Sequence, residues 1–81
     1  MKELLDFIIR NILGKDSKFE ITEEDDGSIV KLTVKTAEDE GGMVIGKQGK
    51  VIKAIRNILR IKATLEKKKI ILLVNPVAEQ S

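Results

Sequence analysis

The residues of this chain best suited to chemistry are the four in the turn Gly46-Lys47-Gln48-Gly49. Glycine tolerates backbone angles that other residues avoid, and it lets a second backbone approach closely. An apolar stretch precedes this turn and a stretch of helical periodicity follows it, so the turn opens a helix whose first N–H groups lack intrahelical partners. The helix dipole favours an anion at that end, and Lys47 and Lys50 add positive charge beside it. The spacing therefore predicts a site for a phosphate group.

Side chains that commonly carry catalysis are absent from the sequence. The chain has no His, Cys, Tyr or Trp, which removes the commonest general acids, general bases and nucleophiles. The remaining carboxylates, lysines and hydroxyls show no catalytic spacing. Without cysteine there are neither disulfides nor thiolate metal sites. We therefore predict that this protein is not an enzyme and that it needs neither a metal nor a cofactor.

One rival motif overlaps the glycine turn. Residues 41–47 read GGMVIGK, which has the spacing of a nucleotide-binding Walker A loop up to its lysine. The next residue is Gln48, where that loop requires a Ser or Thr hydroxyl for Mg²⁺. The acidic residues 38–40 also stand where a buried strand would have to precede the loop. We therefore interpret the Walker A spacing as a chance match.

Charge is distributed unevenly along the chain. Residues 1–42 contain 6 basic and 11 acidic side chains, whereas residues 43–81 contain 9 basic and 2 acidic ones. This asymmetry indicates one basic surface and an anionic partner such as a nucleic acid. The alternative is a solvated charge pattern that happens to be uneven, and composition alone does not separate the two.

The first half of the chain predicts one helix and a β-hairpin. Apolar residues recur at helical spacing over 2–13, and Gly14 is a suitable C-terminal cap. Alternating residues predict short strands over 18–22 and 30–34, joined by a turn at Asp26-Gly27. The acidic run 23–26 is expected at the solvated tip of this hairpin, because a Ca²⁺ loop would need spaced ligands and a glycine.

The second half predicts two helices and a final strand. Thr36 and Asp39 have the spacing of a capping box, so a short helix should start near Ala37 and break at Gly46. A longer helix should follow Gly49 and end near residue 65, with one broad apolar face formed by Val51, Ile52, Ile55, Ile58 and Leu59. The wholly apolar run 70–74 predicts a buried strand, which Pro76 stops.

The order of these elements predicts an α+β fold. The second and last strands are joined through two helices, a crossover long enough to make them parallel neighbours. We therefore expect a three-stranded mixed sheet with three helices on one face, in one domain over residues 1–75, followed by a flexible C-terminal tail over 76–81. No apolar run approaches the ~20 residues of a membrane span, and we expect a cytoplasmic protein.

This order and the motif VIGKQGKVIKAI resemble a KH domain of the type II arrangement. The motif has an apolar pair, Gly-x-x-Gly and two isoleucines three residues apart, here Ile52 and Ile55. The chain is more closely similar to the small, bacterial, single-KH-domain RNA-binding proteins of the KhpA family, which share a stretch like that from Met43 to Lys50. Family members often have a proline where the second helix begins, and the capping box at Thr36 would replace it here.

The resemblance implies a non-catalytic protein that grips about four nucleotides of single-stranded RNA through its Gly-x-x-Gly (GXXG) loop. Gly46 and Gly49 would let the RNA backbone approach, and Lys47 and Gln48 would contact phosphates. An aliphatic groove would hold the bases, with the edge of the second strand, around residues 30–34, as its other wall. The RNA-binding residues that we expect are Ile45, Gly46, Lys47, Gln48, Gly49, Lys50, Ile52, Lys53 and Arg56.

Some of these positions have a simpler interpretation. Lys53, Arg56 and Arg60 lie within roughly 60° of each other on a helical wheel, which fits either a phosphate-binding stripe or a solvated helix surface. Several other apolar side chains are expected to pack in the core rather than to contact RNA, namely Phe7, Phe19, Ile55, Ile58 and Leu59.

Binding by one such domain should be weak, because base stacking on an aromatic contributes ~1–3 kcal/mol per base and the chain has only 2 Phe. A homodimer, or a larger KH-containing partner of the KhpB (Jag) type, would raise the effective concentration of sites. The resemblance implies a role in post-transcriptional regulation or as an RNA chaperone. The alternative is a protein-interaction adaptor on a KH scaffold, which would not need the intact loop and its lysines.

Overall fold

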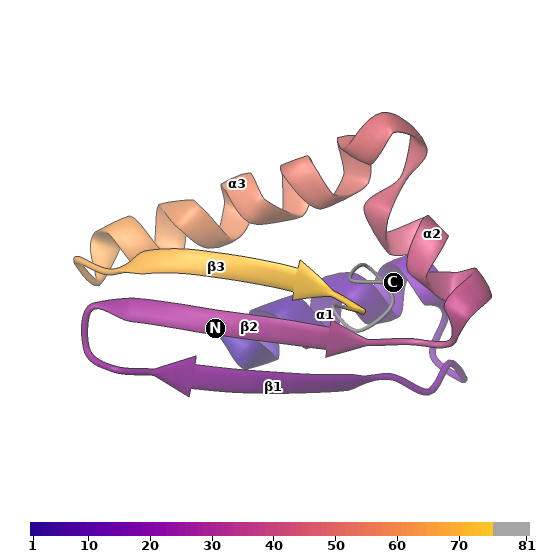
Figure 1. Cartoon of the computed structure of the whole chain (residues 1–81), viewed down its shortest axis with the longest axis horizontal. Helices are drawn as coiled ribbons and strands as arrows, with labels where there is room; N and C mark the ends of the chain where they lie inside the picture. Colours follow the sequence, from indigo (N-terminus) through magenta and orange to yellow (C-terminus); the bar gives the residue numbers. More distant parts are fainter. Residues whose placement is uncertain (76–81) are drawn as a thin grey trace.

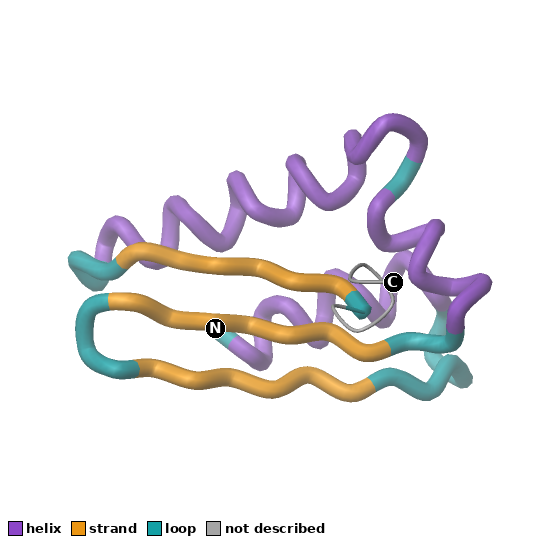
Figure 2. Tube along the Cα trace, in the orientation of Figure 1, coloured by secondary structure: helices purple, strands orange, loops and turns teal. Residues whose placement is uncertain are grey.

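The computed structural model describes residues 1–75 as a sheet covered by helices (Figure 1). The elements follow the predicted order, with Gly46 separating the second helix from a short 3₁₀ turn (Figure 2). Their bounds are α1 (Lys2–Leu13), β1 (Glu20–Asp25), β2 (Ile29–Lys35), α2 (Glu38–Ile45), the 3₁₀ turn η1 (Lys47–Gly49), α3 (Lys50–Leu65) and β3 (Lys69–Val74). The expected tail at 76–81 lies outside the described residues. No helix within residues 1–75 is long and apolar enough to cross a membrane.

The sheet is mixed, as predicted, with β2 at its centre. β1 pairs with β2 antiparallel, from Glu20 opposite Lys35 to Asp25 opposite Val30. β3 pairs with the other edge of β2 in parallel, from residue 29 opposite 69 to residue 34 opposite 74. The parallel pair requires a long crossover, which α2 and α3 supply.

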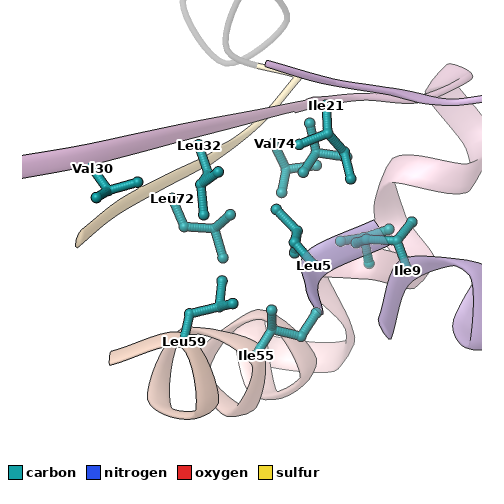
Figure 3. Close-up of a cluster of buried hydrophobic side chains, with 11 residues drawn as sticks. Leu5, Ile9, Ile21, Val30, Leu32, Ile55, Leu59, Leu72 and Val74 are labelled. Carbon is teal, nitrogen blue, oxygen red and sulfur yellow. The ribbon is translucent and has the colours of Figure 1, made fainter. Parts of the chain in front are cut away.

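All three helices bury their apolar stripes against one face of this sheet. Side chains from the strands and from the helices converge in a single layer (Figure 3). The buried cluster consists of Leu5 and Ile9 from α1, Val44 from α2, Ile55 and Leu59 from α3, and Ile21, Val30, Leu32, Val34, Leu72 and Val74 from the strands. Because no helix within residues 1–75 covers the opposite face of the sheet, residues of β2 and β3 alternate between buried and open positions.

This one-sided covering corrects the prediction that the apolar run 70–74 forms a buried strand, because only part of the strand is buried. β3 is an edge strand, and Ile71, which points away from the helices, is 44% exposed. Two expected core residues are wrong for a related reason. Phe7 is 67% exposed, because it lies on the side of α1 opposite the buried stripe of Leu5 and Ile9. Ile58 is 46% exposed, because it lies on the flank of α3 rather than on the stripe that meets the sheet. Phe19 is half-buried, with the Arg10 guanidinium 4.9 Å from its ring centre.

The acidic run 23–26 does not form the hairpin tip as predicted. Residues 23–25 belong to β1, and only Asp26 stands in the turn, where its carboxylate accepts the N–H groups of Ser28 (2.9 Å) and Ile29 (2.8 Å). These backbone hydrogen bonds, Ile29 first, lower the pKa of Asp26. Glu23 accepts the N–H of Lys2 at 3.0 Å, which ties the start of α1 to the sheet.

The capping box predicted at the start of α2 is also wrong. The N-cap residue is Ala37, one residue later than expected, and no side chain within residues 1–75 caps the helix. The hydroxyl of Thr36 instead donates to Ala37 O (2.9 Å) and accepts from Asn75 Nδ2 (3.0 Å). A residue distant in sequence thus takes the hydrogen bond that a local cap would have made.

Candidate nucleic-acid interface

The Gly46–Gly49 loop joins α2 to α3 at one end of the long helix (Figure 1). Three of its residues adopt positive φ, namely Gly46 (φ 78°), Gln48 (φ 58°) and Gly49 (φ 75°). Glycine has little penalty in this region, and Gln48 accepts the left-handed conformation alone among the side-chain-bearing residues of the loop. The resulting turn is tight, with Gly46 N–H bonded to Gly42 O (2.8 Å) and Gly49 N–H bonded to Gly46 O (3.1 Å).

The N-terminus of α3 keeps its positive end uncompensated. Its N-cap is Gly49, no described side chain caps it, and its first turn contains no acidic residue. In most helices a Ser, Thr, Asp or Asn side chain accepts N–H groups at this position. Here the first N–H groups of α3 are open to an acceptor from outside the chain, such as a phosphate oxygen. Lys47 and Lys50 are exposed on either side of Gly49.

The structure brings the nine predicted site residues together along the loop and the first turns of α3. Among residues 1–75, none of the four basic residues in this set forms a salt bridge with another described residue, so their charges are not neutralised locally. Exposed side chains are Lys47, Gln48, Lys50, Lys53 and Arg56, and half-buried residues are Ile45, Gly46, Gly49 and Ile52. The first group forms an exposed surface that is mostly basic, and the two isoleucines offer apolar surface beside it.

The expected second wall of the groove is wrong. β2 is the central strand, bonded on both sides, and the side chains of Val30, Leu32 and Val34 are buried in the core. The strand that runs beside α3 is β3, at the edge of the sheet (Figure 1). Strand order is a long-range property, so the local alternation that identified β2 carried no information about which strand would flank α3.

The basic stripe on α3 is exposed as predicted, and Arg60 Nη2 donates to Asn57 Oδ1 (2.7 Å). A second exposed strip was missed. Ile58, Ile61 and Leu65 are 46%, 66% and 80% exposed on the flank of the same helix. Their spacing of three and four residues is the signal that could have identified them, but the same spacing is typical of core positions.

One lysine just beyond the far end of α3 is paired with a carboxylate of the hairpin. The Lys68 ammonium lies 2.6 Å from Asp25 Oδ2, and the Gly27 N–H donates to Asp25 Oδ1 (2.8 Å). Lys68 above all, and then Gly27, lower the pKa of Asp25, while the same contact raises the pKa of Lys68. Among residues 1–75, Lys62, Lys67 and Lys69 near this end form no salt bridge, so unpaired positive charge is present at both ends of α3.

The residues that mimic a Walker A loop do not have its geometry. Gly41 and Gly42 lie inside α2, and a helix rather than a strand leads into Lys47. A phosphate-binding P-loop instead follows a strand. The interpretation as a chance match is confirmed.

The fold and the loop together define the class of protein. A helix–strand–strand–helix–helix–strand order, a mixed sheet with β2 at its centre, and a Gly-x-x-Gly turn between the last two helices make this a KH domain of the type II arrangement. The protein-family model for the KH domain of KhpA and KhpB matches residues 2–74, and the chain belongs to this family.

Individual relatives agree with this assignment. RNA-binding protein KhpA of Clostridium perfringens is 34% identical over 71 residues, which cover 88% of this chain and 95% of the relative. The KhpA protein of Clostridium acetobutylicum is 32% identical over the same length and shares of the two chains. That of Chlamydia pneumoniae is 36% identical over 59 residues, covering 73% of this chain and 76% of the relative. No solved structure matches the chain. The family consists of KH-domain RNA-binding proteins, a non-enzymatic kind of protein, so the prediction that the chain is not an enzyme is confirmed.

Proposed function

We propose that this protein binds short segments of single-stranded RNA at the Gly46–Gly49 loop and the first turns of α3. The observation that carries the proposal is the uncapped N-terminus of α3, which follows the Gly46–Gly49 turn, has exposed Lys47 and Lys50 beside it, and has no acidic residue in its first turn. The name of the relatives, RNA-binding protein KhpA, supports RNA as the anion.

The loop grips the RNA backbone. Gly49 presents no side chain, so a phosphate can come within hydrogen-bond distance of main-chain N–H groups. Gly46 instead lets the loop pack closely against Val51. Lys47 and Lys50 provide charge, and Gln48 provides an amide donor at the tip. About four nucleotides are held in such a site.

The bases lie against apolar surface rather than between aromatic rings. Ile45 and Ile52 are half-buried at the loop and offer aliphatic contact, and β3 replaces β2 as the strand on the far side. Lys53 and Arg56 stand further along α3 for the next phosphates. Since no aromatic stacking contributes, single-domain affinity is modest and sequence preference is limited.

The direct test replaces the tip of the loop. Lys47→Asp with Gln48→Asp should abolish the fluorescence anisotropy change of a labelled single-stranded RNA, while circular dichroism and the melting temperature stay near those of the parent. Two substitutions that change the net charge equally separate the effect of position from that of charge. Lys47→Glu should weaken binding strongly, and Lys67→Glu should weaken it little, because Lys67 lies just beyond the other end of α3, a helix about 24 Å long. RNA binding that survives the double substitution would show that the loop is not the site.

A weak, non-catalytic grip on single strands suits post-transcriptional regulation or RNA chaperoning in the cytoplasm, where transient contacts with many RNAs are required. A second binding site raises the overall affinity through effective concentration. The exposed side chains of Ile58, Ile61 and Leu65 support a protein contact on α3, either in a homodimer or with a larger KH-containing partner of the KhpB type. Analytical ultracentrifugation of the parent and of Ile61→Lys tests self-association directly.

The same exposed strip favours the second candidate function, a protein-interaction adaptor on a KH scaffold. Capture of partner proteins with and without ribonuclease separates the two. The adaptor would be supported if a partner protein is retained after ribonuclease treatment and if loop substitutions do not change RNA binding. Loss of RNA binding with Lys47→Glu would support the first proposal.

A further inference from the structure

Asn75, the residue that follows β3, joins the end of the sheet to the start of α2. Its N–H donates to Val34 O (2.8 Å), its Oδ1 accepts the N–H of Thr36 (2.8 Å), and its Nδ2 donates to Thr36 Oγ1 (3.0 Å). Asn75 adopts φ 46°, a left-handed conformation that asparagine tolerates better than most residues. Because both ends of its amide are engaged, the side chain is held in one orientation.

The Thr36 hydroxyl links Asn75 to the first turn of α2, because it accepts a hydrogen bond from Asn75 and donates one to Ala37; we call this pair of hydrogen bonds the relay. Oγ1 donates to Ala37 O (2.9 Å), and the same carbonyl accepts the N–H groups of Glu40 and Gly41, each at 3.0 Å. Ala37 is the N-cap of a helix that no side chain caps. Three hydrogen bonds therefore converge on the carbonyl at which α2 begins, and one of them comes from a hydroxyl that Asn75 orients.

Gly41 brings α2 directly against this amide. A Cβ at position 41 would lie 2.5 Å from Asn75 Nδ2 and 3.3 Å from Thr36 Oγ1. Unlike Gly46 and Gly49, Gly41 does not have a positive φ, so this close approach is the reason that glycine is needed here. The cost is a lower intrinsic helix propensity in α2, which also contains Gly42 and so depends on contacts from outside the helix.

We propose that Asn75, acting through Thr36 and against Gly41, is a positioning residue that sets the orientation of α2 and thereby places the Gly46–Gly49 loop for RNA. This inference rests on the proposed function. α2 is about 12 Å long, so a tilt of about 10° at its first turn displaces its loop end by about 2 Å. Binding groups must be held within about 0.5 Å of their productive positions, so a displacement of that size matters.

The test compares Thr36→Val, which keeps the shape of threonine and removes the hydroxyl, with Thr36→Ser, which keeps the hydroxyl. The dissociation constant for a labelled single-stranded RNA of mixed sequence is measured at a temperature where melting curves show both variants fully folded. Amide chemical shifts of residues 46–49 are recorded by NMR on the same samples. We expect Thr36→Val to weaken binding about three- to tenfold and to shift the loop amides, and Thr36→Ser to stay close to the parent.

A purely structural role for this hydrogen-bond relay would give a different result. Thr36→Val would then lower the melting temperature while its dissociation constant and loop amide shifts matched those of Thr36→Ser, and the proposal would be overturned. If the parent protein itself fails to bind RNA, the proposed function falls, and the loop amide shifts still decide whether the relay positions the loop.

A second set of variants does not depend on Thr36. Gly41→Ala forces a methyl group against Asn75, and Asn75→Ala removes both the obstruction and the relay. We expect Gly41→Ala combined with Asn75→Ala to bind RNA no more weakly than the worse single variant, because the two residues act through one contact. Losses that simply multiply would show that the residues act independently, and would overturn the proposal.

Discussion

Gly46 lies so close to the helix it precedes that a Cβ at this position would fall 2.7 Å from Val51 Cβ and 2.8 Å from the Val51 backbone nitrogen. Gly49, three residues later, has a similar φ, but its Cβ would meet only Ile52 Cγ2 at an ordinary 3.9 Å. Both glycines of the motif permit left-handed backbone, but only the first is required by close packing.

This difference predicts unequal effects of alanine in the loop. Gly46→Ala should lower the free energy of unfolding by about 2–4 kcal/mol, because backbone strain and a contact with Val51 add together. Gly49→Ala should cost only about 1–2 kcal/mol, the penalty for a left-handed residue with a side chain. Urea unfolding followed by circular dichroism measures both. Equal losses would mean that contact with Val51 is not what requires Gly46.

Salt should weaken RNA binding to an extent that reports the number of phosphates contacted. With about four phosphates contacted, the logarithm of the association constant should fall with the logarithm of salt concentration with a slope of about −3. Lys47→Gln removes one cation at the loop and should make the slope shallower by about 0.7. Lys67→Gln, at the other end of α3, should leave it unchanged. Anisotropy titrations at several salt concentrations give these slopes, and a flat dependence would contradict phosphate contact.

Stability should fall on the acid side through the hairpin carboxylates. The Lys68 ammonium and the Gly27 N–H lower the pKa of Asp25, so its ionised form is favoured in the folded state. Its contribution is therefore present above the unfolded-state pKa of about 3.9 and is lost as the pH falls through the lower folded pKa. Asp25→Asn should reduce the loss of stability between neutral pH and pH values below about 4, as followed by urea unfolding. An unchanged acid dependence would exclude this carboxylate.

Truncation of a buried and of an exposed leucine of α3 should have very different effects on the free energy of unfolding. Leu59 is fully buried against the sheet (Figure 3), so Leu59→Ala should cost about 2–5 kcal/mol. Leu65 is 80% exposed, and Leu65→Ala should change the free energy of unfolding of the monomer by less than about 0.5 kcal/mol. Thermal and urea unfolding at low protein concentration measure both. A large loss at Leu65 would mean that this side chain is covered in solution, as self-association through α3 would require.

Much of the fold follows from local patterns. Helical periodicity, the glycines at 14 and 46, and β-branched alternation identified every helix and strand to within a few residues, because these signals act between near neighbours. The Asp26-Gly27 turn and the long crossover then led to the mixed sheet. The family resemblance came from the glycine motif, whose residues are contiguous.

The errors fall where a distant partner decides the outcome. Thr36 was expected to cap α2, and its hydroxyl instead serves Ala37 and Asn75, 39 residues further along the chain. Phe7 and Ile58 have the residue type of the core, but their exposure depends on which flank of each helix the sheet covers. No pattern within a few residues carries that information.

Local residue patterns were therefore sufficient to predict the elements, the α+β class and the glycine-bracketed loop at the start of α3, since each depends on backbone preference and local spacing. Long-range packing determines that β3 rather than β2 flanks α3, and that a Cβ at Gly46 would clash with Val51. It also determines that Asn75 hydrogen-bonds to Thr36, next to the first turn of α2. These contacts join residues on different elements, and their distances are fixed only when the helices and the sheet pack into one core.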